Sequence, residues 1–318
     1  MRLGKIATRR SRRSIFLSTI HYPLSSVLCP LFAICYLLFV SNAFGSFFDN
    51  SPGKTGFNFL LLPLTPSSLF KGVADYGISN LEKNPASIWE ENLSFEVSQL
   101  NYFEGLKFNS AKLSFNFQTT DAFGENPQNH YLAIGIRDFS ETDEKREAFT
   151  GIKTGNFNIT SRAIFLSWAL KIGKTIYGIT GKSVSQKIET DSLTGVCLDF
   201  GLLKDIKNFT IGASVLNIGS KISGNSFPTT LNTGVSYFSG SNQLNLEVKK
   251  TSFEKEKILL SFGKRINFIT LLFGIEKQNE LSYNFGVMFE LKNFDFSCGF
   301  SSKKYLGVYQ IYSINFYF

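Results

Sequence analysis

Apolar residues alternate with polar or very small residues along segment after segment of this chain. In residues 281–291 the odd positions are Leu, Tyr, Phe, Val, Phe and Leu, whereas the even positions are Ser, Asn, Gly, Met and Glu. Residues 294–301, 243–249 and 113–118 repeat the pattern. Because the side chains of a strand point alternately to its two faces, each segment predicts a β-strand with one apolar and one polar face.

We expect about 14 such strands between residues 92 and 318. Most are close to the ~10 residues of a tilted strand that crosses a membrane. They start near residues 92, 109, 129, 160, 175, 193, 208, 229, 242, 256, 268, 281, 293 and 307. A large, even number of antiparallel strands is typical of a bacterial outer-membrane barrel.

The connections between these strands alternate in length. The fourth, eighth, tenth and twelfth are tight turns, at residues 173–174, 239–241, 266–267 and 292–293. Among the odd-numbered connections, a charged stretch at residues 140–158 and a second stretch at 217–228 are expected to be long loops. Short turns on one side and long loops on the other are typical of a closed barrel. The second connection, residues 119–128, is long for its side.

A soluble, secreted β-sandwich also alternates, so alternation by itself leaves that fold open. The last expected strand favours the barrel. Its alternate apolar residues are Tyr312, Ile314, Phe316 and Phe318. They resemble the signal by which the closing strand of an outer-membrane barrel is assembled, an aromatic end preceded by apolar residues at every second position. We therefore predict an all-β, transmembrane barrel.

The first 43 residues predict a secretory signal peptide. Six basic residues lie within the first 13 positions, an apolar run of about 15 residues follows, and Ser41-Asn42-Ala43 forms a small-x-small exit. The run is shorter than the ~20 residues of a membrane-spanning helix and contains Pro30, which disfavours a retained anchor. We expect residues 1–43 to be cleaved, residues 44–91 to form a separate N-terminal segment, and residues 92–318 to form the barrel.

Charge and reactive residues disfavour several classes of protein. The formal charge of +8 falls to +2 (8 − 6) without residues 1–43, which hold six basic residues and no acid. Because residues 44–318 are nearly neutral, a nucleic-acid partner is not expected. Beyond residue 43 the chain has Cys197, Cys298 and His130 as its sole cysteines and histidine. They form neither a metal-ligand set nor a nucleophile with its usual base, so we expect no metal, no cofactor and no enzymatic activity.

Residues 44–91 lack sustained alternation and contain prolines that a barrel strand would not accept. This segment is expected to be either a tail outside the barrel or a hatch (a plug) in the lumen. Its motifs resemble those of the PorV/PorQ outer-membrane proteins, which are relatives of the FadL long-chain fatty-acid transporter. The candidate hatch residues that carry the resemblance are Phe59, Leu60, Pro63, Asp75, Asn84, Pro85 and Ala86. Residues 177–188, 198–203, 212–219 and 227–231 resemble further motifs of that family, in the same order.

The resemblance implies a barrel in the outer membrane of a Gram-negative-type envelope, with a hatch in or near its lumen. It leaves three functions open: FadL-like passage of hydrophobic small molecules, a PorV-like role in a type IX-style protein secretion system, and a structural or adhesive surface barrel. The secretion role would act on secreted proteins through surface loops such as residues 140–158. Membrane lipid and the barrel-assembly machinery are the expected partners in all three cases. One departure stands out, since residues 67–72 include the bulky Leu69, Phe70 and Lys71 where the family has mostly glycines.

Overall fold

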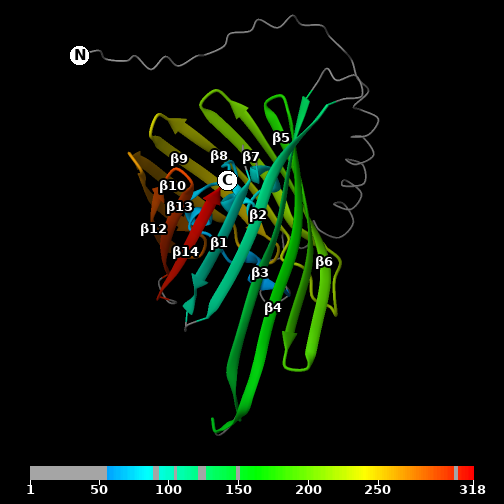
Figure 1. The fold of residues 1–318 in the computed structure, drawn as a ribbon. Helices are drawn as coiled ribbons and strands as arrows, with labels where there is room; N and C mark the ends of the chain where they lie inside the picture. Colours follow the sequence, from blue (N-terminus) through cyan, green and yellow to red (C-terminus); the bar gives the residue numbers. More distant parts are fainter. Residues whose placement is uncertain (1–55, 89–92, 104–105, 121–126, 148–150, 304–306) are drawn as a thin grey trace, which may run out of the picture. The chain divides into compact units, whose positions relative to one another are not determined.

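Fourteen antiparallel strands form a closed barrel in the computed structural model of the chain (Figure 1). The structure describes residues 56–88, 93–103, 106–120, 127–147, 151–303 and 307–318. Each strand pairs with its neighbours in sequence, and β1 pairs with β14 to close the ring. The predicted all-β barrel is therefore confirmed, and the alternative of a soluble sandwich is wrong. The predicted signal peptide, residues 1–43, lies outside the described residues.

The strands start close to the predicted positions. They are β1 Ser94–Asn101, β2 Lys107–Thr120, β3 Pro127–Arg146, β4 Lys153–Ile172, β5 Thr175–Ile188, β6 Asp191–Ile206, β7 Phe209–Gly219, β8 Thr230–Ser239, β9 Asn242–Thr251, β10 Lys257–Ile266, β11 Ile269–Lys277, β12 Leu281–Glu290, β13 Phe294–Lys303 and β14 Gly307–Tyr317. The exception is β4, which starts seven residues before the predicted position of about 160 (160 − 153).

The predicted loop at residues 140–158 is wrong. Strand β3 continues to Arg146, β4 starts at Lys153, and the two strands pair along this whole stretch. Figure 1 shows the β3–β4 hairpin extending beyond the neighbouring strands. The charge content of this stretch suggested a loop, but a two-stranded ribbon that extends beyond its neighbours needs no apolar face and accepts polar pairs across its strands. Thr142 Oγ1, for example, donates a hydrogen bond of 2.8 Å to Asn158 Oδ1 across the ribbon.

The outer face of the barrel is apolar and the inner face is polar. On β12, Tyr283 and Phe285 are 44% and 55% exposed, whereas Ser282 and Asn284 are 6% and 1% exposed. Other strands repeat this arrangement, with Ile134, Ile164, Leu166, Leu246 and Leu260 among the exposed residues. A soluble sandwich buries its apolar faces, so this inverted arrangement is that of a barrel whose outer face contacts lipid.

The apolar side chains of the outer face form a band that ends at two groups of outward-facing polar or aromatic side chains. At one end, His130 stacks between Phe117 and Trp168, with ring centroids 5.1 Å and 5.9 Å away. At the other end, Arg162 Nε lies 2.8 Å from Asp138 Oδ1. His130 and Asp138 are eight residues apart on β3 (138 − 130). Eight residues span about 27 Å along a strand, or about 20 Å of height at a tilt of about 40°, close to the ~25 Å band of membrane barrels.

The two ends of the barrel differ only in part as predicted, because residues 140–158 are mostly strand and β5 connects to β6 on that side through two residues. On the side of the chain termini of the barrel, which we call the turn side, β4–β5, β6–β7, β8–β9 and β10–β11 each connect through two residues. Gly173 and Gly240 have positive φ values of 61° and 59° in these turns, a conformation that glycine adopts without strain. On the opposite side, the loop side, residues 220–229 form a long connection between β7 and β8. Within the described part of the chain, no helix is both long and apolar enough to cross a membrane.

Residues 56–88 fold into the lumen, where they make contacts with the inward-facing side chains of the strands. We call these residues the hatch. Its elements are short: η1 Asn58–Leu61, α2 Ser67–Phe70, η2 Ile78–Asn80 and η3 Pro85–Ile88. Most of its side chains are buried, including Leu64, Phe70 and Ile78. A tail outside the barrel is therefore excluded for the described residues of this segment.

Candidate functional site

The hatch approaches the barrel wall at glycines of the strands. A Cβ atom on Gly178 would lie 2.3 Å from the carbonyl carbon of Pro85, and one on Gly201 would lie 2.0 Å from Asn84 Oδ1. Gly212 makes a third contact of this kind. Distances below 3.0 Å leave no room for a side chain, so the wall itself supplies the small residues that close packing needs. This explains how a hatch with few glycines still packs against the wall.

The predicted hatch residues Asn84, Pro85 and Ala86 lie together against β5 and β6. Asn84 Nδ2 donates to the carbonyl oxygens of Val73, at 2.8 Å, and Leu202, at 3.1 Å. Asn84 Oδ1 accepts a hydrogen bond of 3.0 Å from the Ala86 amide. A single buried amide side chain thus joins two parts of the hatch to each other and to the wall.

Asp75, another predicted hatch residue, is buried. Its Oδ2 accepts a hydrogen bond from Gln243 Nε2 on β9. Burial raises the pKa of Asp75, and the nearby Lys71 ammonium and the Gln243 hydrogen bond oppose this shift. The Asp75 carbonyl accepts a hydrogen bond of 3.0 Å from Asn80 Nδ2 within the hatch. Asp75 therefore links the hatch to β9, three strands away from the contact of Asn84 with β6.

A buried ion-pair network, which the sequence did not reveal, holds the hatch against β1, β2 and β3. Glu82 Oε1 lies 3.2 Å from Lys112 Nζ and 3.4 Å from Arg137 Nη2, while Glu82 Oε2 accepts a hydrogen bond from the Leu64 amide. Lys112 also pairs with Glu96 at 3.1 Å. Burial favours a higher pKa for Glu82, but Lys112 and Arg137 outweigh it and hold the pKa below its usual value.

A second ion pair holds the hatch against β9. Lys83 Nζ lies 2.8 Å from Glu247 Oε2, which also accepts a hydrogen bond of 2.9 Å from the Val73 amide. The sequence contained part of this information, because Glu247 and Lys112 occupy the polar face of an alternating strand. Their partners in the hatch come from a segment without periodicity, so the pairing itself could not be predicted.

The predicted residues Phe59, Leu60 and Pro63 lie towards the loop side. Arg137 Nη1 donates to the carbonyl oxygens of Phe59, at 3.2 Å, and Leu60, at 2.9 Å. Nearby, Phe57 stacks on Phe227 of the β7–β8 connection with ring centroids 4.9 Å apart. The long connection on the loop side therefore folds inward and covers this end of the hatch.

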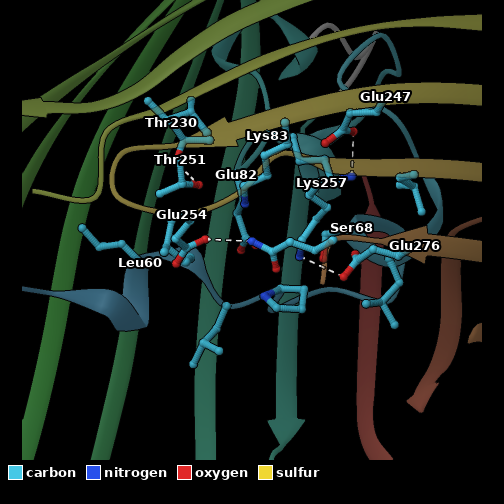
Figure 2. Close-up of a pocket in the computed structure, with 18 of the residues that line it drawn as sticks. Leu60, Ser68, Glu82, Lys83, Thr230, Glu247, Thr251, Glu254, Lys257 and Glu276 are labelled. Carbon is cyan, nitrogen blue, oxygen red and sulfur yellow. Dashed lines mark hydrogen bonds and ion pairs between the residues drawn. The ribbon is translucent and has the colours of Figure 1, made fainter. Parts of the chain in front are cut away.

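A cavity of about 200 Å³, which we call the vestibule, lies between this part of the hatch and the strands β7 to β11, β13 and β14 (Figure 2). Apolar residues of the hatch and wall form its floor: Leu60, Leu61, Leu62, Pro63, Leu69, Leu216 and Leu259. Charged and hydroxyl-bearing residues form its walls, among them Glu247, Lys249, Thr251, Lys257, Glu276, Lys303 and Tyr309. The vestibule therefore combines an apolar floor with strongly polar walls.

The predicted assembly residues lie apart from the vestibule. Tyr312, Ile314 and Phe316 belong to the outward face of β14, and Phe316 stacks on Phe95 of β1 with centroids 6.5 Å apart. Phe318 is 73% exposed, and its amide donates to the Leu93 carbonyl. These residues thus lie at the seam that closes the barrel, and their role in assembly stays a prediction.

The reactive residues named from the sequence are also dispersed. His130 lies on the outer face, where its Nε2 is 2.8 Å from Thr119 Oγ1. Cys197 is buried and Cys298 is half-buried, and both are free thiols. Among the described residues, no group of three or more His, Cys, Asp or Glu side chains is arranged to hold a metal ion.

Comparison with known proteins supports the fold alone. No protein-family model and no curated protein matches the chain. Among solved structures, the chain is similar to a mutant of TodX, a monoaromatic hydrocarbon channel, with a TM-score of 0.57 and 12% identity over 80% of this chain and 99% of that one. A mutant of the Rh. blastica porin aligns with a TM-score of 0.43 and 8% identity over 71% of this chain and 99% of that one, too low to support an argument. The resemblance to the PorV/PorQ family stays a prediction.

Proposed function

We propose that this protein is a channel of an outer membrane that admits apolar small molecules and that its hatch is the gate. The observation that carries the proposal is the position of the hatch. The same segment fills the lumen and forms the floor of the vestibule on the loop side. A molecule that binds in the vestibule would therefore contact the element that obstructs its route.

The outer face of the barrel supports a membrane location. Its exposed leucine, isoleucine and phenylalanine side chains would be unfavourable in water over so large a continuous surface. A closed barrel satisfies every backbone group along its strands, which is the condition for strands to cross lipid. The predicted signal peptide and the predicted assembly residues agree with export to an outer membrane.

The construction of the hatch supports a gate. Its described helical elements have at most four residues each, and helices of that length have little stability of their own. Side-chain contacts to the wall hold the hatch in place, whereas long ladders of backbone hydrogen bonds hold the barrel. The hatch can therefore rearrange at a free-energy cost far below that of opening the barrel.

The vestibule floor supports an apolar cargo. The side chains of Leu61 and Leu62, together with Pro63, line the cavity on the hatch side, and Leu259 lines it on the wall side. The TodX structure, which is described as a monoaromatic hydrocarbon channel, shares the fold, and this makes a small aromatic hydrocarbon the first cargo to try. Burial of such a molecule against leucine side chains is favourable at about 25 cal/mol per Å² of apolar surface.

Uptake of radiolabelled toluene tests the proposal. Cells that express the protein should take up toluene faster than cells with an empty vector. Leu62→Ser should reduce this gain because it places a hydroxyl group in the vestibule floor, whereas Leu291→Ser, at an exposed turn-side position, should leave it unchanged. Equal uptake with and without the protein would refute the proposed cargo.

One observation favours protein secretion as a second candidate function. In the β3–β4 ribbon, strand β3 extends beyond its other neighbour, since β2 pairs with β3 only up to Phe139 whereas β3 continues to Arg146. Free edges are able to pair with a strand of another protein. Mass spectrometry of the protein extracted from its own membranes would test this candidate. Secreted proteins that co-purify with the intact chain, but not with a variant lacking residues 141–157, would support it.

A further inference from the structure

The walls of the vestibule hold more ammonium groups than carboxylates can neutralise. Lys257 Nζ is 2.9 Å from Glu276 Oε1 (Figure 2), and Lys83 Nζ is 2.8 Å from Glu247 Oε2. In the part of the chain that the structure describes, neither Lys249 nor Lys303 has a carboxylate oxygen within 4.0 Å. Both lysines are half-buried and line the cavity.

The other two carboxylates of the cavity form no ion pair within 4.0 Å with Lys249 or Lys303 in the described part of the chain. Glu82 already contacts Lys112 and Arg137 with one oxygen and the Leu64 amide with the other. Glu254 Oε2 accepts a hydrogen bond of 3.4 Å from Gln278 Nε2. The positive charge of the vestibule is thus concentrated on β9, β10 and β13.

Half-buried ammonium groups of like charge destabilise one another unless an anion lies between them. Lys249 and Lys257 belong to adjacent, hydrogen-bonded strands and pair directly with each other in the β9–β10 register. Lys303 Nζ lies 5.9 Å from the ring centroid of Tyr309, which orients this lysine at the cavity rather than at a carboxylate. Three ammonium groups, those of Lys249, Lys257 and Lys303, therefore line the cavity, and only Lys257 has a carboxylate partner among the described residues.

We infer that the vestibule binds a compact oxyanion, with the chemistry of phosphate, sulfate or a small carboxylate, between Lys249, Lys257 and Lys303. The cavity of about 200 Å³ equals the volume of roughly seven water molecules at ~30 Å³ each, enough for such an anion with part of its hydration shell. Lysine ammonium groups bind such an oxyanion through charge-assisted hydrogen bonds. The inference does not depend on an apolar cargo or on a moving hatch.

Equilibrium dialysis of the purified, detergent-solubilised protein with radiolabelled inorganic phosphate tests the inference. We expect saturable binding of one phosphate, with sulfate and acetate as competitors. The double variant Lys249→Gln/Lys303→Gln should bind at least about tenfold more weakly, because two charge-assisted contacts are lost. The matched control, Lys174→Gln/Lys292→Gln, removes the same charge from exposed turn-side positions and should bind as the parent chain does.

A second double variant guards against a folding defect. Lys249→Arg/Lys303→Arg keeps both charges, so it should retain saturable phosphate binding. Heat-dependent mobility on a denaturing gel should be the same for all variants, since a closed barrel resists unfolding until it is boiled. Absence of saturable binding to the parent chain, or an equal loss in the vestibule and control variants, would overturn the inference.

Discussion

Replacing Gly178 with alanine should loosen the hatch without opening the barrel. A Cβ atom at this position would lie 2.3 Å from the carbonyl carbon of Pro85, 2.4 Å from the Ala86 nitrogen and 2.6 Å from the Pro85 oxygen. All three atoms belong to the hatch backbone, which cannot rotate aside as a flexible side chain would. To reach an ordinary contact of 3.4 Å or more, the hatch must move about 1 Å away from β5.

Such overpacking typically costs about 1–3 kcal/mol. If this cost falls on the closed position of the hatch, its opening equilibrium rises about 5- to 150-fold. Amide hydrogen exchange measures that equilibrium directly. The amides of residues 78–88 should exchange faster by this factor, whereas the strand amides of β9 to β14 should be unchanged.

Gly181→Ala provides a matched control on the same strand. A Cβ atom there would meet Leu198 Cδ2 at 3.9 Å, which is an ordinary van der Waals contact. Exchange in the hatch should therefore match the parent chain. If Gly178→Ala and Gly181→Ala behaved alike, the close packing of Pro85 against β5 would be refuted.

Three further predictions concern the ion-pair network, its dependence on pH and the lipid-facing surface. Glu82→Gln leaves the buried charge of Arg137 uncompensated, since Lys112 still pairs with Glu96, at a cost of about 3–5 kcal/mol. The hatch should become susceptible to protease, and a hatch as resistant as that of the parent chain would contradict this. Because the pKa of Glu82 is lowered on folding, its stabilising effect is present above the unfolded value of 4.5 and is lost as the pH falls through the lower folded value. Hatch exchange should therefore accelerate below about pH 4.5 in the parent chain, and less in Glu82→Gln; an equal acid response in both would count against the network. Leu166→Lys, in the middle of the apolar band, should destabilise the barrel in lipid vesicles by about 2–4 kcal/mol, measured by urea unfolding against Leu166→Ala, and equal stabilities would show that this face does not contact lipid.

The positions of the strands could be predicted from the sequence because alternation is a local property. The alternation of apolar and polar residues in a strand is visible from the residues of that strand alone. A tight turn such as that at Gly173 then defines where the strand ends. The ribbon at residues 140–158 was missed for a related reason. Its charge content is typical of a loop, and the continued pairing of β3 with β4 depends on where the neighbouring strands end, which the local sequence does not show.

The contacts of the hatch could be predicted only in part. Motif resemblance singled out Asn84 and Asp75, which the structure places at the wall. The motif at residues 177–188 includes the complementary Gly178, but nothing in its local sequence shows that the hatch backbone approaches this glycine. Lys249 appeared as one more polar residue of an alternating strand, and its lack of a carboxylate partner is visible only in three dimensions.

The central claim is that the hatch must move for a molecule to pass. A Cβ atom on Gly72 would lie 3.4 Å from the Cβ of Asn245 on β9, close to the ~3.8 Å of a disulfide. Gly72→Cys/Asn245→Cys should therefore lock the hatch to the wall when oxidised. We predict that toluene uptake falls to the empty-vector level in the oxidised double variant and recovers on reduction, while each single variant responds to neither treatment. Undiminished uptake through the locked protein would contradict the claim.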